Sequence, residues 1–394
     1  MGAGNCLRPH RTSNIVNSKA EDFMNRSQIW KAGAVLILGC FLFCGRVNGQ
    51  SIITYQAPGA GTASGQGTFA FGITPLGAAY GYYIDGSGVV HGFIRDFNGT
   101  FTTFSAPGAG TASGQGTFAF GLDTWGEVTG YFIDSSGVMH GYVRNLRGIF
   151  TTFDAPGAGT GSGQGTESLN INTRGTVAGF DFDTNGVAHA FLRSAQGKFT
   201  TYEGPGAGTG PGQGTGTAST IGLGLDDTVT GAIIDSGSNL HGYVRSPSGN
   251  ITVINAPGAG TGPGQGTDLD GLNLEGVISG VYVDADTVLH GFVRSPNGRI
   301  TTFDAPGAGT GPGQGTQPQG LNLENAIVGA VIDSSGVEHG FLRSPDGAFT
   351  TFDAPGAGTS AGQGTFPLLI NIAGIITGYE IDPSGAAHGF LRIP

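Results

Sequence analysis

The sequence predicts an all-β fold, a seven-bladed β-propeller with four antiparallel strands in each blade. Three observations support this prediction. One glycine-rich phrase recurs seven times at a nearly constant spacing. Each repeat holds four short runs of strand-forming residues. The repeated region starts with the fourth strand of a repeat and stops after the third, so its two ends together complete one blade.

The first 49 residues differ in composition from the repeats, and we interpret them as a secretory signal peptide. They hold all three cysteines, six of the 17 Lys and Arg residues and the apolar run from Ala32 to Cys44. Read from Met24, which we expect to be the true start, a basic segment precedes this run and cleavage falls near Gly49. A membrane helix needs about 20 apolar residues, so we expect no membrane span in the mature chain. An uncleaved anchor and lipoprotein processing at Cys40 are the alternatives.

Residues 50–394 are predicted to be a single secreted or periplasmic domain. They contain no cysteine, so packing must stabilise the fold without disulfides. Removing the leader takes away six basic and two acidic residues and changes the net charge from −11 to −15. A strongly acidic surface argues against nucleic acid as a partner. The 77 glycines fit tight turns and close backbone approaches.

The repeat is marked by a Pro/Gly loop and by a histidine. Ala-Pro-Gly-Ala-Gly-Thr begins at Ala57, Ala106, Ala155, Ala256, Ala305 and Ala354, and Gly204 opens a seventh copy. Successive prolines are 49 residues apart, except that Pro205 and Pro257 are 52 apart, which places an insertion in the fourth repeat. Repeats of this length are typical of solenoids, propellers or bead-like arrays.

The first repeat shows the four expected strands, over residues 68–74, 79–85, 89–96 and 100–106. Val, Ile, Tyr, Phe and Thr dominate these runs, and Gly, Asn, Asp or Ser separate them. Three connections are short enough for antiparallel hairpins. The fourth is the Pro/Gly loop, which is long enough to reach the next blade, and its Pro-Gly start favours a type II turn.

The ends of the repeated region predict closure into a ring. A lone fourth strand, residues 51–56, opens it, and a third strand, residues 388–393, closes it. Pairing the N-terminal strand with the C-terminal three strands completes the seventh blade and removes exposed sheet edges. An open β-solenoid or a bead-like array is the alternative architecture.

The units resemble HAF repeats of bacterial extracellular proteins, which are named for a His-Ala-Phe element. His189-Ala190-Phe191 carries the element literally, and other repeats have His-Gly-Phe or His-Gly-Tyr, as at 91–93 and 140–142. The family's Gly-Ile-Asn-x-x-Gly turn has counterparts at 170–175 and 271–276. Two features depart from the family: Arg replaces an aromatic residue after the element, and the Pro/Gly loop is long. The resemblance implies export and a propeller-like fold, and no established activity.

One polar set recurs in all seven units: an Asp, a His six residues later and an Arg four residues after that. A catalytic interpretation would pair Asp with His, but Arg lies about 13 Å further along the strand at about 3.3 Å per residue, and no Ser or Cys recurs beside them. We therefore assign the set to structural contacts between strands and sheets rather than to catalysis. Its members are Asp85, His91, Arg95, Asp134, His140, Arg144, Asp183, His189, Arg193, Asp235, His241, Arg245, Asp284, His290, Arg294, Asp333, His339, Arg343, Asp382, His388 and Arg392.

No metal or cofactor site is predicted. Calcium loops need several carboxylates within a few residues, and only Asp284-Ala-Asp286 offers more than one. The glycine-rich loops lack the lysine and helix of a phosphate-binding loop. The loop glutamines, Gln66 to Gln363, are expected to hydrogen-bond a neighbouring loop or to contact a ligand.

The favoured function is a non-enzymatic binding or surface protein, expected to be a monomer. Its Pro/Gly loops and Asp turns should share one rim, because alternate connections of a meander lie on the same side. That rim would contact a polysaccharide, a cell-envelope component or a protein. A glycan lyase or hydrolase is an alternative, with its site near the fourth-repeat insertion, residues 216–220, and the unmatched Asp226 and Asp227. A self-assembling matrix component is a third possibility.

Overall fold

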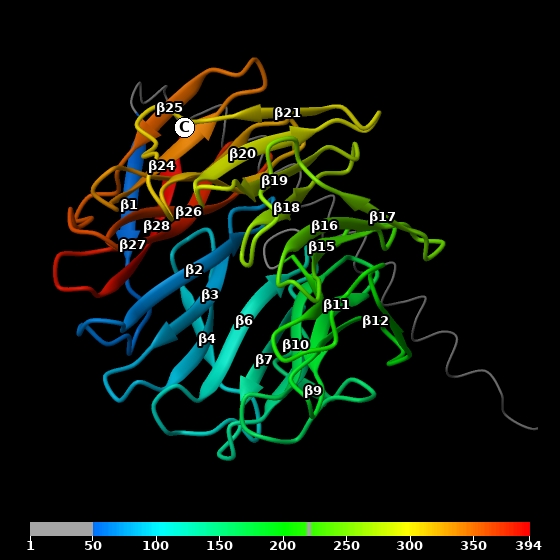
Figure 1. Ribbon diagram of the computed structural model, residues 1–394. Coiled ribbons are helices and arrows are strands. Elements are labelled where there is room, and N and C mark those ends of the chain that lie inside the picture. Colours follow the sequence, from blue (N-terminus) through cyan, green and yellow to red (C-terminus); the bar gives the residue numbers. More distant parts are fainter. Residues whose placement is uncertain (1–49, 219–221) are drawn as a thin grey trace, which may run out of the picture. The chain divides into compact units, whose positions relative to one another are not determined.

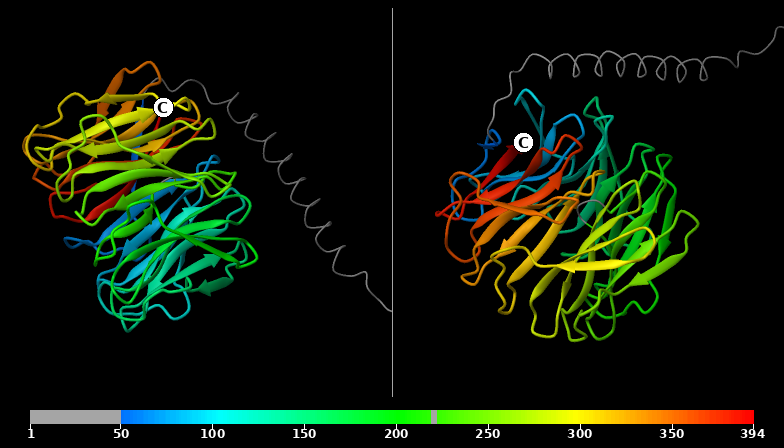
Figure 2. Two further views of the ribbon diagram at one scale, coloured as in Figure 1. Left: turned by 45° about the vertical axis from the view of Figure 1, so that its right-hand side comes forward. Right: turned by 90° about the horizontal axis from the view of Figure 1, so that it is seen from above.

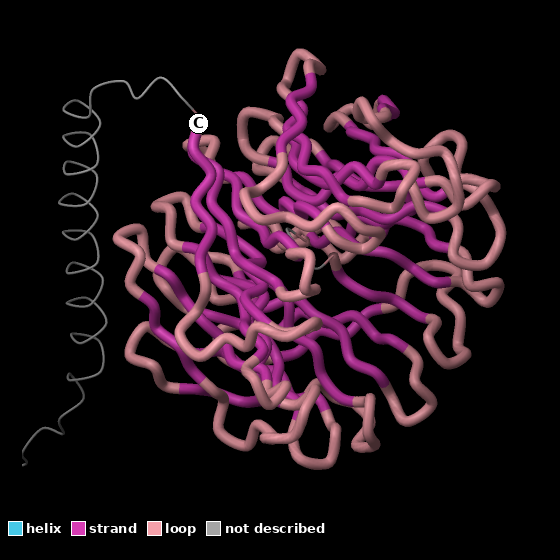
Figure 3. The backbone as a smooth tube through the Cα atoms, turned by 90° about the vertical axis from the view of Figure 1, so that its left-hand side faces the viewer, coloured by secondary structure: helices cyan, strands magenta, loops and turns pink. Residues whose placement is uncertain are grey.

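The described residues, 50–218 and 222–394, form 28 β-strands in a computed structural model (Figure 1). Strands and connecting loops account for all of this part, and no helix occurs in it (Figure 3). Accordingly, no helix suited to crossing a membrane is found among these residues. The predicted signal peptide, residues 1–49 with Met24 and Cys40, lies outside the described residues, as do residues 219–221 of the predicted insertion.

Antiparallel pairing joins the strands in seven groups of four. Group 1 is β2 (Gly67–Ile73), β3 (Ala79–Ile84), β4 (Val90–Arg95) and β5 (Phe101–Phe104); group 2 is β6 (Gly116–Leu122), β7 (Val128–Ile133), β8 (Met139–Arg144) and β9 (Phe150–Phe153); group 3 is β10 (Gly165–Ile171), β11 (Val177–Phe182), β12 (Ala188–Arg193) and β13 (Phe199–Tyr202); group 4 is β14 (Gly214–Thr217), β15 (Val229–Ile234), β16 (Leu240–Arg245) and β17 (Ile251–Ile254). Group 5 is β18 (Gly266–Leu272), β19 (Ile278–Val283), β20 (Leu289–Arg294) and β21 (Ile300–Phe303); group 6 is β22 (Gly315–Leu321), β23 (Ile327–Ile332), β24 (Glu338–Arg343) and β25 (Phe349–Phe352); group 7 is β26 (Gly364–Ile370), β27 (Ile376–Ile381), β28 (Ala387–Ile393) and β1 (Ser51–Tyr55).

The groups are not separate sheets, which differs from the prediction of discrete blades. A parallel bridge joins the third strand of each group to the first strand of the next, as between Val90 and Gly116, so all 28 strands form one hydrogen-bonded sheet. The first three strands of every group, 21 in all, make the closed circuit, and each fourth strand pairs only with its own third strand. Gly116 permits this approach because a Cβ there would overlap the carbonyl of Val90. The architecture is therefore all-β and a closed, propeller-like repeat fold.

Closure occurs where the sequence predicts it. Strand β1 pairs with β28 from Ser51 opposite Ile393 to Tyr55 opposite Gly389, and the two lie side by side in blue and red (Figures 1 and 2). The junction repeats the bonds of the other junctions: Gly65 N–H donates to Gly385 O over 2.9 Å, as Gly114 N–H does to Gly88 O. Strand β1 thus completes group 7, and the bridge between Gly67 and Ala387 closes the circuit of 21 strands.

The apolar core is divided among the groups. The aromatic residue two positions after each histidine is fully buried, and these residues are Phe93, Tyr142, Phe191, Tyr243, Phe292, Phe341 and Phe390. Around Phe292, for example, the core takes Leu269 and Ile278 from group 5 and Ile254 from group 4. The first strands lie innermost, since β2 contacts both β26 and β6.

The repeated arginines join neighbouring groups rather than pairing with the Asp and His of their own group. The guanidinium of Arg343 lies 4.9 Å from the ring centroid of Phe303, on the fourth strand of the preceding group. Arg95, Arg144, Arg193, Arg245 and Arg392 make the same contact at 4.4–4.9 Å. In these six contacts the guanidinium lies against an aromatic ring of the preceding group, which is a cation–π interaction. At the position facing Arg294, group 4 carries Ile254.

Candidate ligand-binding sites

The Pro/Gly loops and the Asp turns share one rim, as predicted. Each loop starts with a type II turn, in which Ala60 N–H donates to Ala57 O and Gly59 has a φ of 93°. Its hydrogen bonds reach the Asp turn of the preceding group, and its glutamine bonds the Asp turn of its own group: Gln66 Nε2 donates to Gly86 O over 3.2 Å. The loop glutamine therefore braces the rim, and its amide is occupied by protein partners.

Each histidine of the rim is held by its two ring nitrogens. The Nε2 atoms lie 3.1–3.7 Å from the Oδ2 atoms of the repeated Asp residues. The Nδ1 atoms contact the residue two positions before the loop proline, a partner that the sequence did not predict. That residue varies around the ring, as Ser105, Asp154, Glu203, Asn255, Asp304, Asp353 and Gln56. The contact between Asp and His, which we call the rim frame, is the same in every group. The residue that contacts Nδ1 differs from group to group.

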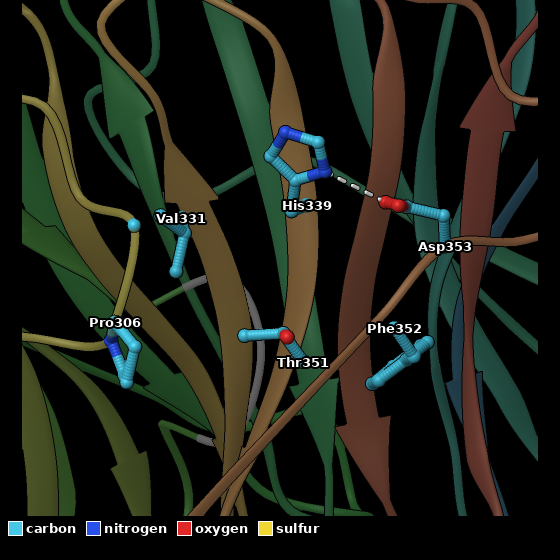
Figure 4. Close-up of a pocket in the computed structure, with 7 residues that line it drawn as sticks. Pro306, Val331, His339, Thr351, Phe352 and Asp353 are labelled. Carbon is cyan, nitrogen blue, oxygen red and sulfur yellow. Dashed lines mark hydrogen bonds and ion pairs between the residues drawn. The ribbon is translucent and has the colours of Figure 1, made fainter.

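A second variable residue lies opposite the histidine on the second strand of each group. In groups 1, 2 and 5 an aromatic ring stacks on the histidine, as Tyr83 does on His91 at 4.9 Å. Group 6 has Val331 at this position, and a cavity of about 240 Å³ remains between Pro306, His339 and Asp353 (Figure 4). There His339 Nδ1 lies 2.9 Å from Asp353 Oδ1.

Hydrogen bonds and neighbouring charges shift the pKa values of the acids and histidines on the rim. The backbone N–H of Val337 donates to Asp333 and, with His339, holds the pKa of this carboxyl below its ordinary value despite burial. For His189, burial would lower the pKa, but the hydrogen bond and charge of Glu203 raise it above its ordinary value. At the Asp284-Ala-Asp286 turn, Asp284 accepts from backbone N–H groups and lies 3.3 Å from His290, so its carboxylate is already engaged.

A second candidate site, which we call the β14 pocket, lies along β14 in group 4. A cavity of about 410 Å³ is lined by residues from groups 2 to 5, among them the acids Glu167, Asp268 and Asp270. Burial raises the pKa of Glu167 to about 7 and that of Asp268 to about 6. Burial and the charge of Asp268 raise the pKa of Asp270 well above its ordinary value. Glu167, Asp268 and Asp270 therefore give this cavity an acidic lining.

The unmatched Asp226 and Asp227 of the insertion do not line this cavity. Asp227 accepts from Asn172 Nδ2 over 2.8 Å and lies 3.7 Å from Arg174 Nη1, so it joins group 4 to group 3. Asp226 accepts from the backbone N–H of Thr228. Among the described residues, no group of three or more His, Cys, Asp or Glu side chains is arranged to hold a metal ion.

The signal for the β14 pocket is present in the sequence. The residue after Gly-Thr on each first strand is Phe69, Phe118, Glu167, Gly216, Asp268, Gln317 and Phe366 in turn. The position is aromatic in groups 7, 1 and 2, where rings such as Phe69 and Tyr82 stack at 5.3 Å. It is acidic, amide-bearing or empty in groups 3 to 6. Comparing the repeats at this one position, rather than seeking shared residues, reveals the asymmetry.

No family model matches this chain, and no curated protein matches it in sequence. Solved structures resemble it in fold. The BP39L lectin from Burkholderia pseudomallei is 13% identical, with a TM-score of 0.53 over 82% of this chain and 93% of the lectin. Puromycin hydrolase is also 13% identical, with a TM-score of 0.52 over 84% of this chain and 55% of the hydrolase. At such identities the likeness shows the fold alone.

Proposed function

We propose that this chain is a secreted, non-enzymatic glycan-binding protein of the HAF-repeat type, a seven-bladed β-propeller in which each group is one blade. The observation that carries the proposal is the open site of group 6, set in a rim frame that recurs seven times. The fold likeness to a lectin, BP39L, agrees with a binding role.

The chemistry of the group 6 site suits a sugar. Sugar hydroxyls pair with carboxylates, and Asp353, whose Oδ1 contacts His339, offers its carboxylate at the cavity edge. Pro306 and Phe352 provide apolar surface for the carbon-bound hydrogens of the ring. Mostly apolar walls with a few placed polar groups are typical of small-ligand sites.

The position of the open site indicates the kind of partner. The group 6 cavity lies on the hydrogen-bonded belt of loops that forms the rim. A polysaccharide or a densely glycosylated surface is therefore the proposed partner.

Substituting Val331→Tyr tests the proposal at group 6. The new ring should stack on His339 as Tyr282 stacks on His290 at 4.8 Å, filling the cavity without changing the frame. We expect glycans selected on an array with the purified full-length chain to bind at least about 10-fold more weakly to this variant in calorimetry. The control is Ser335→Ala, on the same rim. An array without hits, or unchanged affinity for Val331→Tyr, would contradict the proposed site.

A further inference from the structure

The β14 pocket exists because group 4 lacks a side chain that other groups have. Gly216 occupies the position of Phe69 and Phe118. A Cβ built at Gly216 meets nothing nearer than Phe180 Cδ1 at 3.8 Å, and no positive φ forbids a side chain there. The cavity of about 410 Å³ is thus a consequence of one missing ring rather than of a strained backbone.

The pocket has acidic groups on both sides of the gap. Glu167 comes from β10 in group 3, and Asp268 and Asp270 come from β18 in group 5. Among the described residues that line it, none is Lys, Arg or His. Burial raises the pKa of Glu167 and also that of Asp268, although the backbone N–H of Leu269 donates to Asp268 Oδ1. A ligand that carries a positive charge would stabilise the charged form of these carboxylates.

Apolar and hydroxyl groups complete the lining. Phe120 and Phe180 contribute aromatic surface, and an aromatic face attracts a cation. Thr217 also lines the cavity; it is 7% exposed, and its Oγ1 has no hydrogen-bond partner among the described residues. A buried hydroxyl without a partner is costly, and a polar atom of a bound ligand would satisfy it.

We propose that the β14 pocket binds an organic ammonium compound, with its cationic nitrogen between Glu167 and Asp268 and its apolar part against Phe120 and Phe180. A neutral sugar is a weaker fit, because it brings no positive charge to the carboxylates. This site shares no lining residue with the rim cavity of group 6. The failure of one proposal would therefore leave the other unaffected.

The test uses choline and its neutral isostere 3,3-dimethylbutan-1-ol, which differ in charge but hardly in shape. Calorimetry on the purified full-length chain should show one site for choline in the millimolar range or tighter and at least about 10-fold weaker binding of the alcohol. Glu167→Gln with Asp268→Asn should weaken choline binding by about 10-fold or more while leaving the alcohol unaffected. The control Glu324→Gln removes the charge of an exposed carboxylate and should change neither affinity.

A second variant fills the pocket. Gly216→Phe gives group 4 the residue of groups 1, 2 and 7 and should abolish choline binding while circular dichroism and the melting temperature show an intact fold. If this variant does not fold, the carboxyl-to-amide variant decides alone. Equal binding of choline and the alcohol, binding that survives in either pocket variant, or no choline binding at millimolar concentration would each overturn the proposal.

Discussion

At the scale of single residues, the acids of this chain fall into two classes with opposite pH behaviour. Rim carboxylates such as Asp333 accept backbone hydrogen bonds, which keeps their pKa low. For the partly buried acids Glu167 and Asp268 the effect of burial prevails, and it raises their pKa values to about 7 and about 6, even though Asp268 accepts one backbone hydrogen bond. In their charged form, the carboxylates of the first class stabilise the fold and those of the second class destabilise the fold.

The buried class predicts how stability changes with pH. Between about pH 4, where unfolded carboxyls titrate, and the raised folded values, the folded chain binds more protons than the unfolded chain. Raising the pH through this window therefore lowers the free energy of unfolding. Glu167→Gln should raise that free energy by about 1–3 kcal/mol at pH 8 and by little at pH 4.

Urea denaturation of both proteins across this pH range measures the effect. A uniform gain at every pH would show that Glu167 titrates normally and would contradict the account. Below about pH 4 the rim carboxylates act in the opposite direction, because their stabilising contribution is lost as they are protonated.

At the scale of elements, the link between each Pro/Gly loop and the following strand depends on one threonine. The threonine after the first glycine of each first strand is fully buried, and its Oγ1 accepts from the backbone N–H that opens the loop. In group 6, Thr316 accepts from Ala305 over 2.9 Å. This bond satisfies an N–H that the loop could not pair otherwise.

Thr316→Val should therefore lower the free energy of unfolding by about 1–3 kcal/mol, because it leaves the buried Ala305 N–H unpaired while keeping the side-chain volume. Thr316→Ser, which keeps the hydroxyl, should lose less. Thr350→Val, at an exposed position on β25, serves as the control for the Thr-to-Val change. If urea denaturation gave equal values for the variants at 316 and 350, the proposed role of the hydroxyl would be wrong.

The strands were predictable because their local signals agree. Alternating β-branched and aromatic residues, with Gly or Asn at each turn, placed the strands of the first repeat within one or two residues of their observed bounds, apart from the shorter β5. The histidine's second partner, such as Asp353, was missed because it lies 14 residues away and varies between repeats. The arginine stacking was missed because it joins different groups, which no local pattern encodes.

At the scale of the whole molecule, the pairing of the N-terminal and C-terminal strands could be predicted from the repeat. The differences between the seven groups could not be predicted from the residues that the repeats share. The residues that recur in all seven repeats define the rim frame. A comparison limited to these residues overlooks the positions where the repeats differ. The β14 pocket and the open site of group 6 both arise where a residue without an aromatic ring, Gly216 or Val331, stands in the place of an aromatic residue of other groups. In this chain the repeats build the scaffold, and the departures from the repeat build the candidate sites.

The ring closure can be tested directly by a disulfide between the two ends. With the three native cysteines replaced by serine, Ser51→Cys with Ile393→Cys should form an intrachain disulfide, because these residues pair directly across β1 and β28. Ser344 is the group 6 counterpart of Ile393, so Ser51→Cys with Ser344→Cys is the control and should stay reduced. Mass spectrometry under mild oxidation should find the crosslink in the first variant alone. A crosslink in neither variant, or in both, would contradict the pairing of β1 with β28 that completes the seventh group.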